Sequence, residues 1–161
     1  MRFMNIIKWE ASMISYRDVP YSQISVIKDL WDRNRKYHED LSKHFGSIYS
    51  NLVFEDRMKP FGQFDKEHIK ITIAENSHDK KIIGYCISTY EGSKGETQTL
   101  HVAEEARGTG IGKNLMNSNL KWMKDSGCTV VNITVAFENS NTIEFYRSLG
   151  FRENTIEMRL E

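Results

Sequence analysis

The chain has 161 residues, and its 22 Lys and Arg balance its 22 Asp and Glu, so the formal net charge is zero. Nucleic-acid binders usually carry a basic excess, so no nucleic-acid partner is expected. No apolar run approaches the roughly 18 residues of a membrane helix, so no membrane partner is expected either. Cys86 and Cys128 each lie in an apolar run, which favours free thiols in a cytoplasmic protein over a disulfide.

One domain is expected over residues 14–161. Hydrophobic residues make up 39% of the chain, which suffices for one core at this length. No repeat or Gly/Ser linker interrupts the sequence. The first apolar run is broken by Lys8 and Glu10 and is too polar for a signal peptide. Residues 1–13 are therefore interpreted as a flexible lead-in.

The first half of the chain predicts one strand followed by two helices. Residues 14–17 alternate apolar and polar, and after Pro20 the residue Ser22 can cap a helix. Apolar residues then recur at helical spacing over residues 24–31 and again over 37–52. Residues 55–67, which contain Pro60 and Gly62, are expected to form a loop.

The middle of the chain predicts an antiparallel meander. Alternating runs cover residues 69–74, 82–90 and 96–102, and the turns between them are too short for crossover helices.

In the last third of the chain the spacing of apolar residues changes from the alternation of strands to the helical period. An apolar stripe over residues 111–123 predicts a helix that ends before Gly127, and residues 130–137 form a β-branched run. Asn141 and Glu144 resemble a capping box for a helix ending at Gly150. Phe151 and the alternating residues 156–160 predict a last strand. The fold class is thus α/β (α+β), with a mixed, mainly antiparallel sheet of about six strands flanked by helices.

The most informative segment runs from Val102 to Lys113, where a strand ends, glycines follow and a helix begins. Such a loop can be a plain turn, or it can present free backbone N–H groups and the helix dipole to a phosphate. The glycines at 108, 110 and 112 fit neither the P-loop nor the dinucleotide fingerprint. They disfavour a protein that binds ATP or NAD.

Two motifs together resemble the GNAT superfamily of N-acetyltransferases. The first is Arg107-x-x-Gly110-x-Gly112. The second runs from Asn139 to Phe151 as Asn-x-x-Thr-x-x-Phe-Tyr-x-x-x-Gly-Phe, with Thr142 where the family usually has Ala. The resemblance is specific over residues 69–160 and covers residues 14–68 in layout only.

This resemblance implies acetyl-CoA as cosubstrate. It implies that the loop binds the pyrophosphate through backbone amides, that the strand before it pairs with the pantetheine arm, and that the N–H of Leu100 stabilises the oxyanion at a bulge. Asn139 either touches the pantetheine arm or caps a turn. The implied cofactor-binding residues are Leu100, His101, Val102, Arg107, Gly108, Thr109, Gly110, Ile111, Gly112, Lys113, Asn139 and Tyr146.

The resemblance also implies catalytic roles. Tyr146 occupies the position of a proton donor to the departing thiolate, or else is a core tyrosine. Glu96 is the main candidate for the general base, or else is a solvated residue after Gly95. In a regular strand Glu96 and Leu100 share one face and His101 points the other way, which leaves His101 as a weaker candidate.

No metal site is predicted, because His38-Glu39 is followed by His44, which does not complete the HExxH spacing. The expected function is N-acyl transfer from acetyl-CoA to an amine by direct attack in a ternary complex. The acceptor is expected to be an amine-bearing small molecule or protein. The alternative is a non-catalytic CoA-binding regulatory module. The amphipathic tail could pair across a homodimer.

Overall fold

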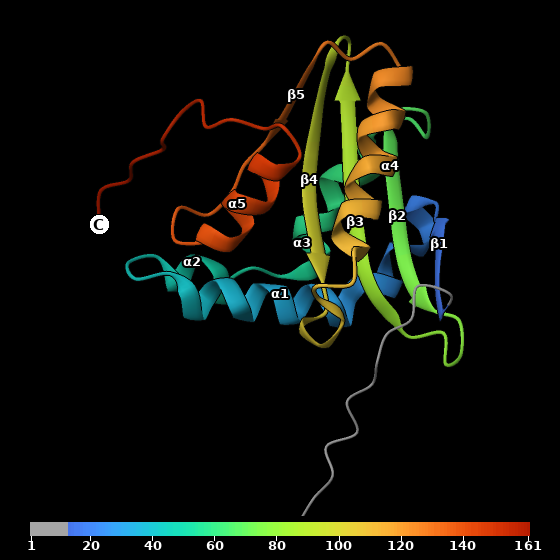
Figure 1. The fold of residues 1–161 in the computed structure, drawn as a ribbon. Coiled ribbons are helices and arrows are strands. Elements are labelled where there is room, and N and C mark those ends of the chain that lie inside the picture. The colour runs from blue at the N-terminus through green and yellow to red at the C-terminus, as the bar shows by residue number, and fades with distance from the viewer. Residues whose placement is uncertain (1–12) are drawn as a thin grey trace, which may run out of the picture.

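The computed structural model describes residues 13–161. Its centre is a five-stranded sheet in the order β1-β2-β3-β4-β5 (Figure 1). The strands are β1 (Ile14–Asp18), β2 (Ile69–Asn76), β3 (Ile82–Glu91), β4 (Lys94–Val102) and β5 (Val130–Ile133). β1 to β4 pair antiparallel in sequence order, and β5 pairs parallel to β4. The expectation of a flexible lead-in concerns residues that, apart from Met13, lie outside the described part of the chain.

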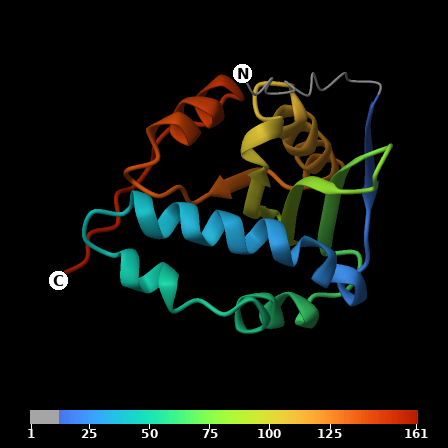
Figure 2. The same ribbon diagram turned by 90° about the horizontal axis from the view of Figure 1, so that it is seen from below.

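Helices cover both faces of this sheet (Figure 2). One face carries η2 (Tyr21–Ile27), α1 (Lys28–Leu41), α2 (Gly46–Ser50), α3 (Phe54–Met58) and η3 (Lys59–Gln63). The other face carries α4 (Ile111–Asp125) and α5 (Ser140–Ser148). The short helix η4 (Glu104–Ala106) leads from β4 into the glycine loop. The predicted α/β class, with a mainly antiparallel sheet between helices, is confirmed.

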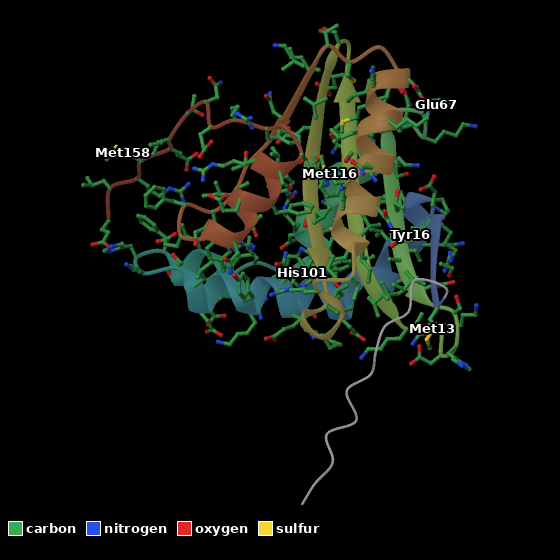
Figure 3. The ribbon with its side chains drawn as sticks, in the orientation of Figure 1. Met13, Tyr16, Glu67, His101, Met116 and Met158 are labelled. Carbon is green, nitrogen blue, oxygen red and sulfur yellow. The ribbon has the colours of Figure 1, made fainter. Side chains whose placement is uncertain are left out.

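The core forms where the apolar stripes of these helices meet the buried strands. Ile27 and Leu30 from η2 and α1 are buried against one face, and Leu115 and Met116 from α4 against the other. Figure 3 labels Met116, where α4 lies over the strands. Their spacing in the sequence matches the helical period, so one side of each helix is apolar. This packing fixes the positions of α1, α4 and β4, which surround the site described below.

Several local predictions were wrong. Residues 55–67 contain α3 and η3 rather than only a loop, because Phe54, Met58 and Phe61 are buried in the core. β5 ends at Ile133, four residues before the predicted end. The residues after Gly150 form no strand, so the sheet has five strands rather than six. Ile156, Met158 and Leu160 of this tail are exposed, because the segment does not join the sheet and its side chains are not buried by it.

Helix starts also differ from the predictions. The helix expected after Ser22 begins instead as the 3-10 turn η2 at Tyr21, with Pro20 in the capping position and no side-chain cap. The cap of α5 is Asn139, whose side chain accepts from the Thr142 N–H, so Asn141 lies inside the helix. None of the helices in residues 13–161 is both long and apolar enough to cross a bilayer.

Candidate functional site

The strands β4 and β5 diverge and leave an unpaired stretch of β4. β5 pairs with β4 only from Lys94 to Thr97, and β4 continues to Val102. Residues 99–102 therefore have a strand partner on the β3 side only, Gln98 has none on either side, and the helix α5 lies beside this opening (Figure 1). Backbone groups on the open side can pair with an extended, peptide-like ligand.

The glycine loop follows directly at the end of this open stretch. Gly108 and Gly110 have φ values of +75° and +85°, and an added Cβ at either position would meet no atom within 4 Å. Gly110 is the N-cap of α4, and no side chain caps that helix. The first N–H groups of any helix lack intrahelical partners, and here no capping side chain occupies them, at the positive end of a 15-residue helix. The loop therefore has the form of an anion-binding cradle.

The other predicted loop residues divide into exposed and buried groups. Lys113 is exposed, whereas Ile111 is 1% exposed and belongs to the core, so only its backbone can reach a ligand. The Thr109 hydroxyl donates to the Ala106 carbonyl at 2.6 Å and stabilises the turn. A Cβ at Gly112 would touch Phe145 of α5 and Val102 at 3.5–3.6 Å.

Arg107 is exposed and lies across the open end of β4. Its Nε donates to the Val102 carbonyl at 3.2 Å, and its guanidinium lies 5.4 Å from the ring centroid of Tyr37 in α1. The residue thus connects the glycine loop to the helices on the opposite face of the sheet.

Tyr146 of α5 is 5% exposed and belongs to the hydrophobic core. Its ring packs edge-on against Phe145 and Phe151. Burial, with a smaller contribution from Cys86, raises the pKa of its phenol, so Tyr146 is protonated at neutral pH. The Tyr146 hydroxyl makes no hydrogen bond with any residue in the described range. Its oxygen is not among the buried side-chain atoms without a partner, so it is accessible and can donate to a ligand.

Asn139 is buried and stabilises the start of α5. Its side-chain oxygen accepts from the Thr142 N–H and from the Tyr37 hydroxyl, both at 3.4 Å. Of the two roles considered for Asn139, capping is therefore present. Contact with a pantetheine arm stays a prediction.

A bulge in β4 changes which side chains share a face. The register with β3 shifts between the pairs Ile87–Thr99 and Ser88–Thr97, so Gln98 is the extra residue. The bulge expected at Leu100 thus lies two residues earlier. Bulges of this kind re-aim the side chains that follow them.

The predicted face pattern was consequently wrong. Glu96 pairs with Thr89 and His101 pairs with Tyr85. Thr89 and Tyr85 are four residues apart on β3, so they share a face, and Glu96 and His101 share it as well. Leu100 pairs with Cys86 and points to the opposite face. Glu96 is exposed, whereas His101 is 8% exposed.

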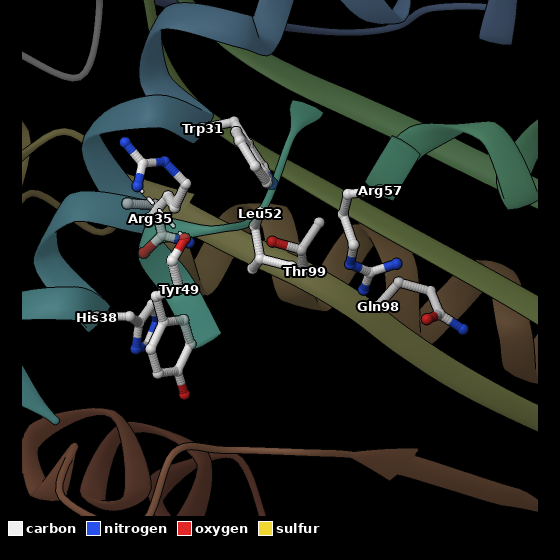
Figure 4. A pocket seen from close by; sticks show the side chains of 9 residues that line it. Trp31, Arg35, His38, Tyr49, Leu52, Arg57, Gln98 and Thr99 are labelled. Carbon is white, nitrogen blue, oxygen red and sulfur yellow. Dashed lines mark hydrogen bonds between the residues drawn. The ribbon is translucent and has the colours of Figure 1, made fainter. Parts of the chain in front are cut away.

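A pocket lies beside this bulge. Its volume is about 150 Å³, and it is enclosed by α1, α2, α3 and β4 (Figure 4). The lining residues are Trp31, Asn34, Arg35, His38, Tyr49, Leu52, Arg57, Gln98 and Thr99. Gln98 and Thr99 are also the first residues of the open stretch of β4. A molecule in the pocket therefore lies next to the gap between β4 and β5.

Among the residues that line the pocket, His38 has the side chain best suited to act as a general base. Its ring stacks on Tyr49 with centroids 5.3 Å apart, at the opposite end of the pocket from Arg57 (Figure 4). Its Nδ1 is buried and has no hydrogen-bond partner among residues 13–161. Burial lowers the pKa of His38, so the ring is neutral near pH 7 and able to accept a proton. Only its place in the folded chain distinguishes this histidine from the others.

His101 should make the fold sensitive to acid. Burial, aided by the cationic side chains of Arg107 and Arg33, lowers the pKa of His101 to about 3. Below pH 6.5 the unfolded chain binds a proton at this site that the folded chain excludes. The stability contributed by neutral His101 is therefore complete above about pH 6.5 and is lost as the pH falls toward 3, by at most about 1.4 kcal/mol per pH unit.

We expect His101→Gln to reduce this acid sensitivity. The measurement is the melting temperature of both proteins between pH 7 and pH 5, with the difference between them narrowing as the pH falls. His38 and Glu105 also act on His101 and remain in both proteins. If the melting temperatures of the two proteins fall in parallel over this pH range, His101 takes up a proton in the folded protein as readily as in the unfolded chain.

No cluster of three or more potential metal ligands occurs among the histidine, cysteine and acidic side chains of residues 13–161. Both cysteines are free, with Cys86 buried and Cys128 partly exposed.

Comparison with known proteins gives both sequence and fold relatives. An uncharacterized N-acetyltransferase from Methanocaldococcus jannaschii is 38% identical over 61 residues, which are 38% of this chain and 27% of that protein. The chain thus matches about a quarter of the length of that relative.

Solved structures share the whole fold at low identity. The BH1408 protein from Bacillus halodurans, solved as a tetramutant, superposes with a TM-score of 0.73 at 19% identity, covering 91% of this chain and 99% of that one. AAC(6')-Iy, solved with the bisubstrate analogue CoA-S-monomethyl-acetylneamine, superposes with a TM-score of 0.59 at 19% identity, covering 92% and 98%. At this identity the likeness concerns the fold.

The family model described as the acetyltransferase (GNAT) family matches residues 28–151. That span includes the glycine loop, the open stretch of β4, the pocket and Tyr146. The chain therefore belongs to the GNAT family of acetyltransferases.

Proposed function

We propose that this protein transfers an acetyl group from acetyl-CoA to the amine of an acceptor by direct attack while both are bound. The observation that carries the proposal is the open stretch of β4, residues 98–102, which leads into the uncapped start of α4 and borders the pocket. These features fit a ligand with a pyrophosphate and a peptide-like arm, which acetyl-CoA has. The amine as acceptor is supported by the N-acetyltransferase relative and by the AAC(6')-Iy complex.

In this proposal the backbone of the chain binds the cosubstrate. The N–H groups at the start of α4 bind the pyrophosphate, with Arg107 and Lys113 adding positive charge at the loop. The open edge of residues 100–102 pairs with the pantetheine arm. A backbone N–H of the bulged segment, that of Leu100, stabilises the negative charge that develops on the carbonyl oxygen.

In the same proposal, side chains carry out the two proton transfers of the reaction. The acceptor must lose a proton before it attacks, and Glu96, on the pocket face of β4, is the proposed base. Tyr146 donates a proton to the departing thiolate, and its hydroxyl has the two properties that this requires, namely protonation at neutral pH and no competing hydrogen bond. The alignment of the two reactants across the bulge supplies proximity.

Binding of acetyl-CoA should depend on Gly110. A valine there would be strained, because φ is +85°, and its side chain would occupy the space above the helix start. We expect Gly110→Val to weaken acetyl-CoA binding by at least tenfold, measured by isothermal titration calorimetry.

The matched control is Gly127→Val. Gly127 also has a positive φ, +89°, with no atom within 4 Å of an added Cβ, but it follows α4 at its far end. It should lose similar stability and keep its affinity for acetyl-CoA. Equal loss of affinity in both variants would mean that general destabilisation, not the loop, is responsible. Acetyl-CoA, and not ATP or NAD, should raise the melting temperature of the unaltered protein.

A further inference from the structure

The pocket beside the bulge is positively charged. Arg35 and Arg57 line it, and no Asp or Glu is among its lining residues. His38 adds no charge near neutral pH, because burial lowers its pKa. A net positive, partly enclosed site favours a ligand that carries negative charge.

The two arginines differ in what already binds them. Arg35 Nη1 lies 3.4 Å from a carboxylate oxygen of Glu39 and 3.3 Å from the carbonyl oxygen of Tyr49. Its side chain is only 23% exposed, so Arg35 stabilises the packing of α1 against α2. Arg35 is thus already paired within the fold through Nη1.

Arg57 has no such partner. Across residues 13–161 its guanidinium makes no hydrogen bond or ion pair, and its one ring contact is with Phe61, 5.1 Å from guanidinium carbon to centroid. The ring holds the flat face of the guanidinium and leaves its N–H edge available. Figure 4 shows Arg57 at the end of the pocket where Gln98 lies. A half-buried, fixed and unpaired guanidinium thus lines the pocket next to the bulge.

We propose that the acceptor is a small amine that also carries a carboxylate, and that Arg57 binds this carboxylate. A guanidinium matches a carboxylate with two parallel hydrogen bonds, which fixes orientation as well as position. With the carboxylate held by Arg57, the amine lies beside Gln98 and Thr99 at the bulge. Trp31 and Leu52 supply apolar surface for the rest of the molecule. This inference rests on the proposed function and assigns its acceptor class.

The unpaired guanidinium also acts on competing acceptors. It repels polycations, which would bring several like charges into a site with no carboxylate among its lining residues. The pocket therefore selects against polyamines and aminoglycosides.

The test compares matched acceptors. Free CoA released from acetyl-CoA is measured with the twenty L-amino acids, with their primary amides, and with neamine and spermidine as polycations. We expect the best acceptor to be an amino acid, with a kcat/KM roughly 10- to 100-fold above that of its own amide, the range of a charged hydrogen-bonded contact.

Two variants distinguish a direct contact between Arg57 and the carboxylate from a general effect of positive charge. Arg57→Gln should remove the preference for acid over amide, mainly through a higher KM for the acid. Lys59→Gln removes an exposed positive charge two residues along the chain, outside the pocket lining, and should keep the preference. Melting temperatures of both variants establish that they are folded.

Amides or polycations acetylated as well as the amino acids would overturn this inference and leave the proposed function standing. A preference for the acid that survives Arg57→Gln would assign the carboxylate to another group and also overturn it. If acetyl-CoA binds and no amine in the panel is acetylated, both proposals fail.

Discussion

Tyr146→Phe should lower kcat by on the order of 100-fold while leaving the protein folded and able to bind acetyl-CoA. The substitution removes only the hydroxyl and keeps the ring that packs between Phe145 and Phe151. Because the hydroxyl makes no hydrogen bond within the described residues, its removal forfeits no contact, so the melting temperature should stay equal or rise slightly. The measurements are kcat, the Kd for acetyl-CoA and the melting temperature on one variant.

Tyr90→Phe is the matched control. Tyr90 lies near the end of β3 and packs on His68 and Trp122, away from the opening between β4 and β5. Its loss of a phenol hydroxyl should leave kcat unchanged. A normal kcat in Tyr146→Phe would assign Tyr146 to the core alone and remove it from the mechanism, without affecting the proposal that acetyl-CoA binds.

Glu96→Gln should lower kcat/KM by roughly 10²- to 10⁴-fold, because the glutamine cannot take the proton of the amine. The acidic limb of the pH–rate profile should weaken with it. Glu96 is exposed and pairs across the sheet with Thr89, so the substitution should change stability little. Affinity for acetyl-CoA, measured by calorimetry, should be unchanged.

His38→Asn provides the decisive comparison for the base. His38 offers a buried, unpartnered Nδ1 inside the pocket, whereas Glu96 lies on the same face of β4 as the bulged Gln98 without lining the pocket. We expect the larger loss of kcat/KM in Glu96→Gln. A larger loss in His38→Asn, with a nearly normal Glu96→Gln, would transfer the role to the histidine.

The parts of the site that depend on local sequence were predictable. The glycine loop is encoded in a few adjacent residues from Arg107 to Gly112, since positive φ values and an uncapped helix start need nothing distant. The position of Tyr146 on a helix next to that loop followed from a second short motif. The alternation of β2, β3 and β4 likewise predicted their antiparallel pairing, because the turns between them are too short for crossover helices.

The parts that depend on tertiary packing were not predictable. The extra residue at Gln98 leaves no mark in the alternation of β4, yet it places His101 rather than Leu100 on the face of Glu96. Arg57 lies in a segment interpreted as a loop, and only the burial of Phe54, Met58 and Phe61 turns it toward the pocket. The tail after Gly150 alternates like a strand, but no strand edge pairs with it.

Acetyl transfer from acetyl-CoA to an amine can be tested by following free CoA thiol with and without the amine panel and by identifying the product by mass spectrometry. We expect thiol release that requires an amine and an N-acetylated product in equal amount. Tight binding of acetyl-CoA with no amine-dependent thiol release would contradict it and would identify the protein as a CoA-binding module without turnover.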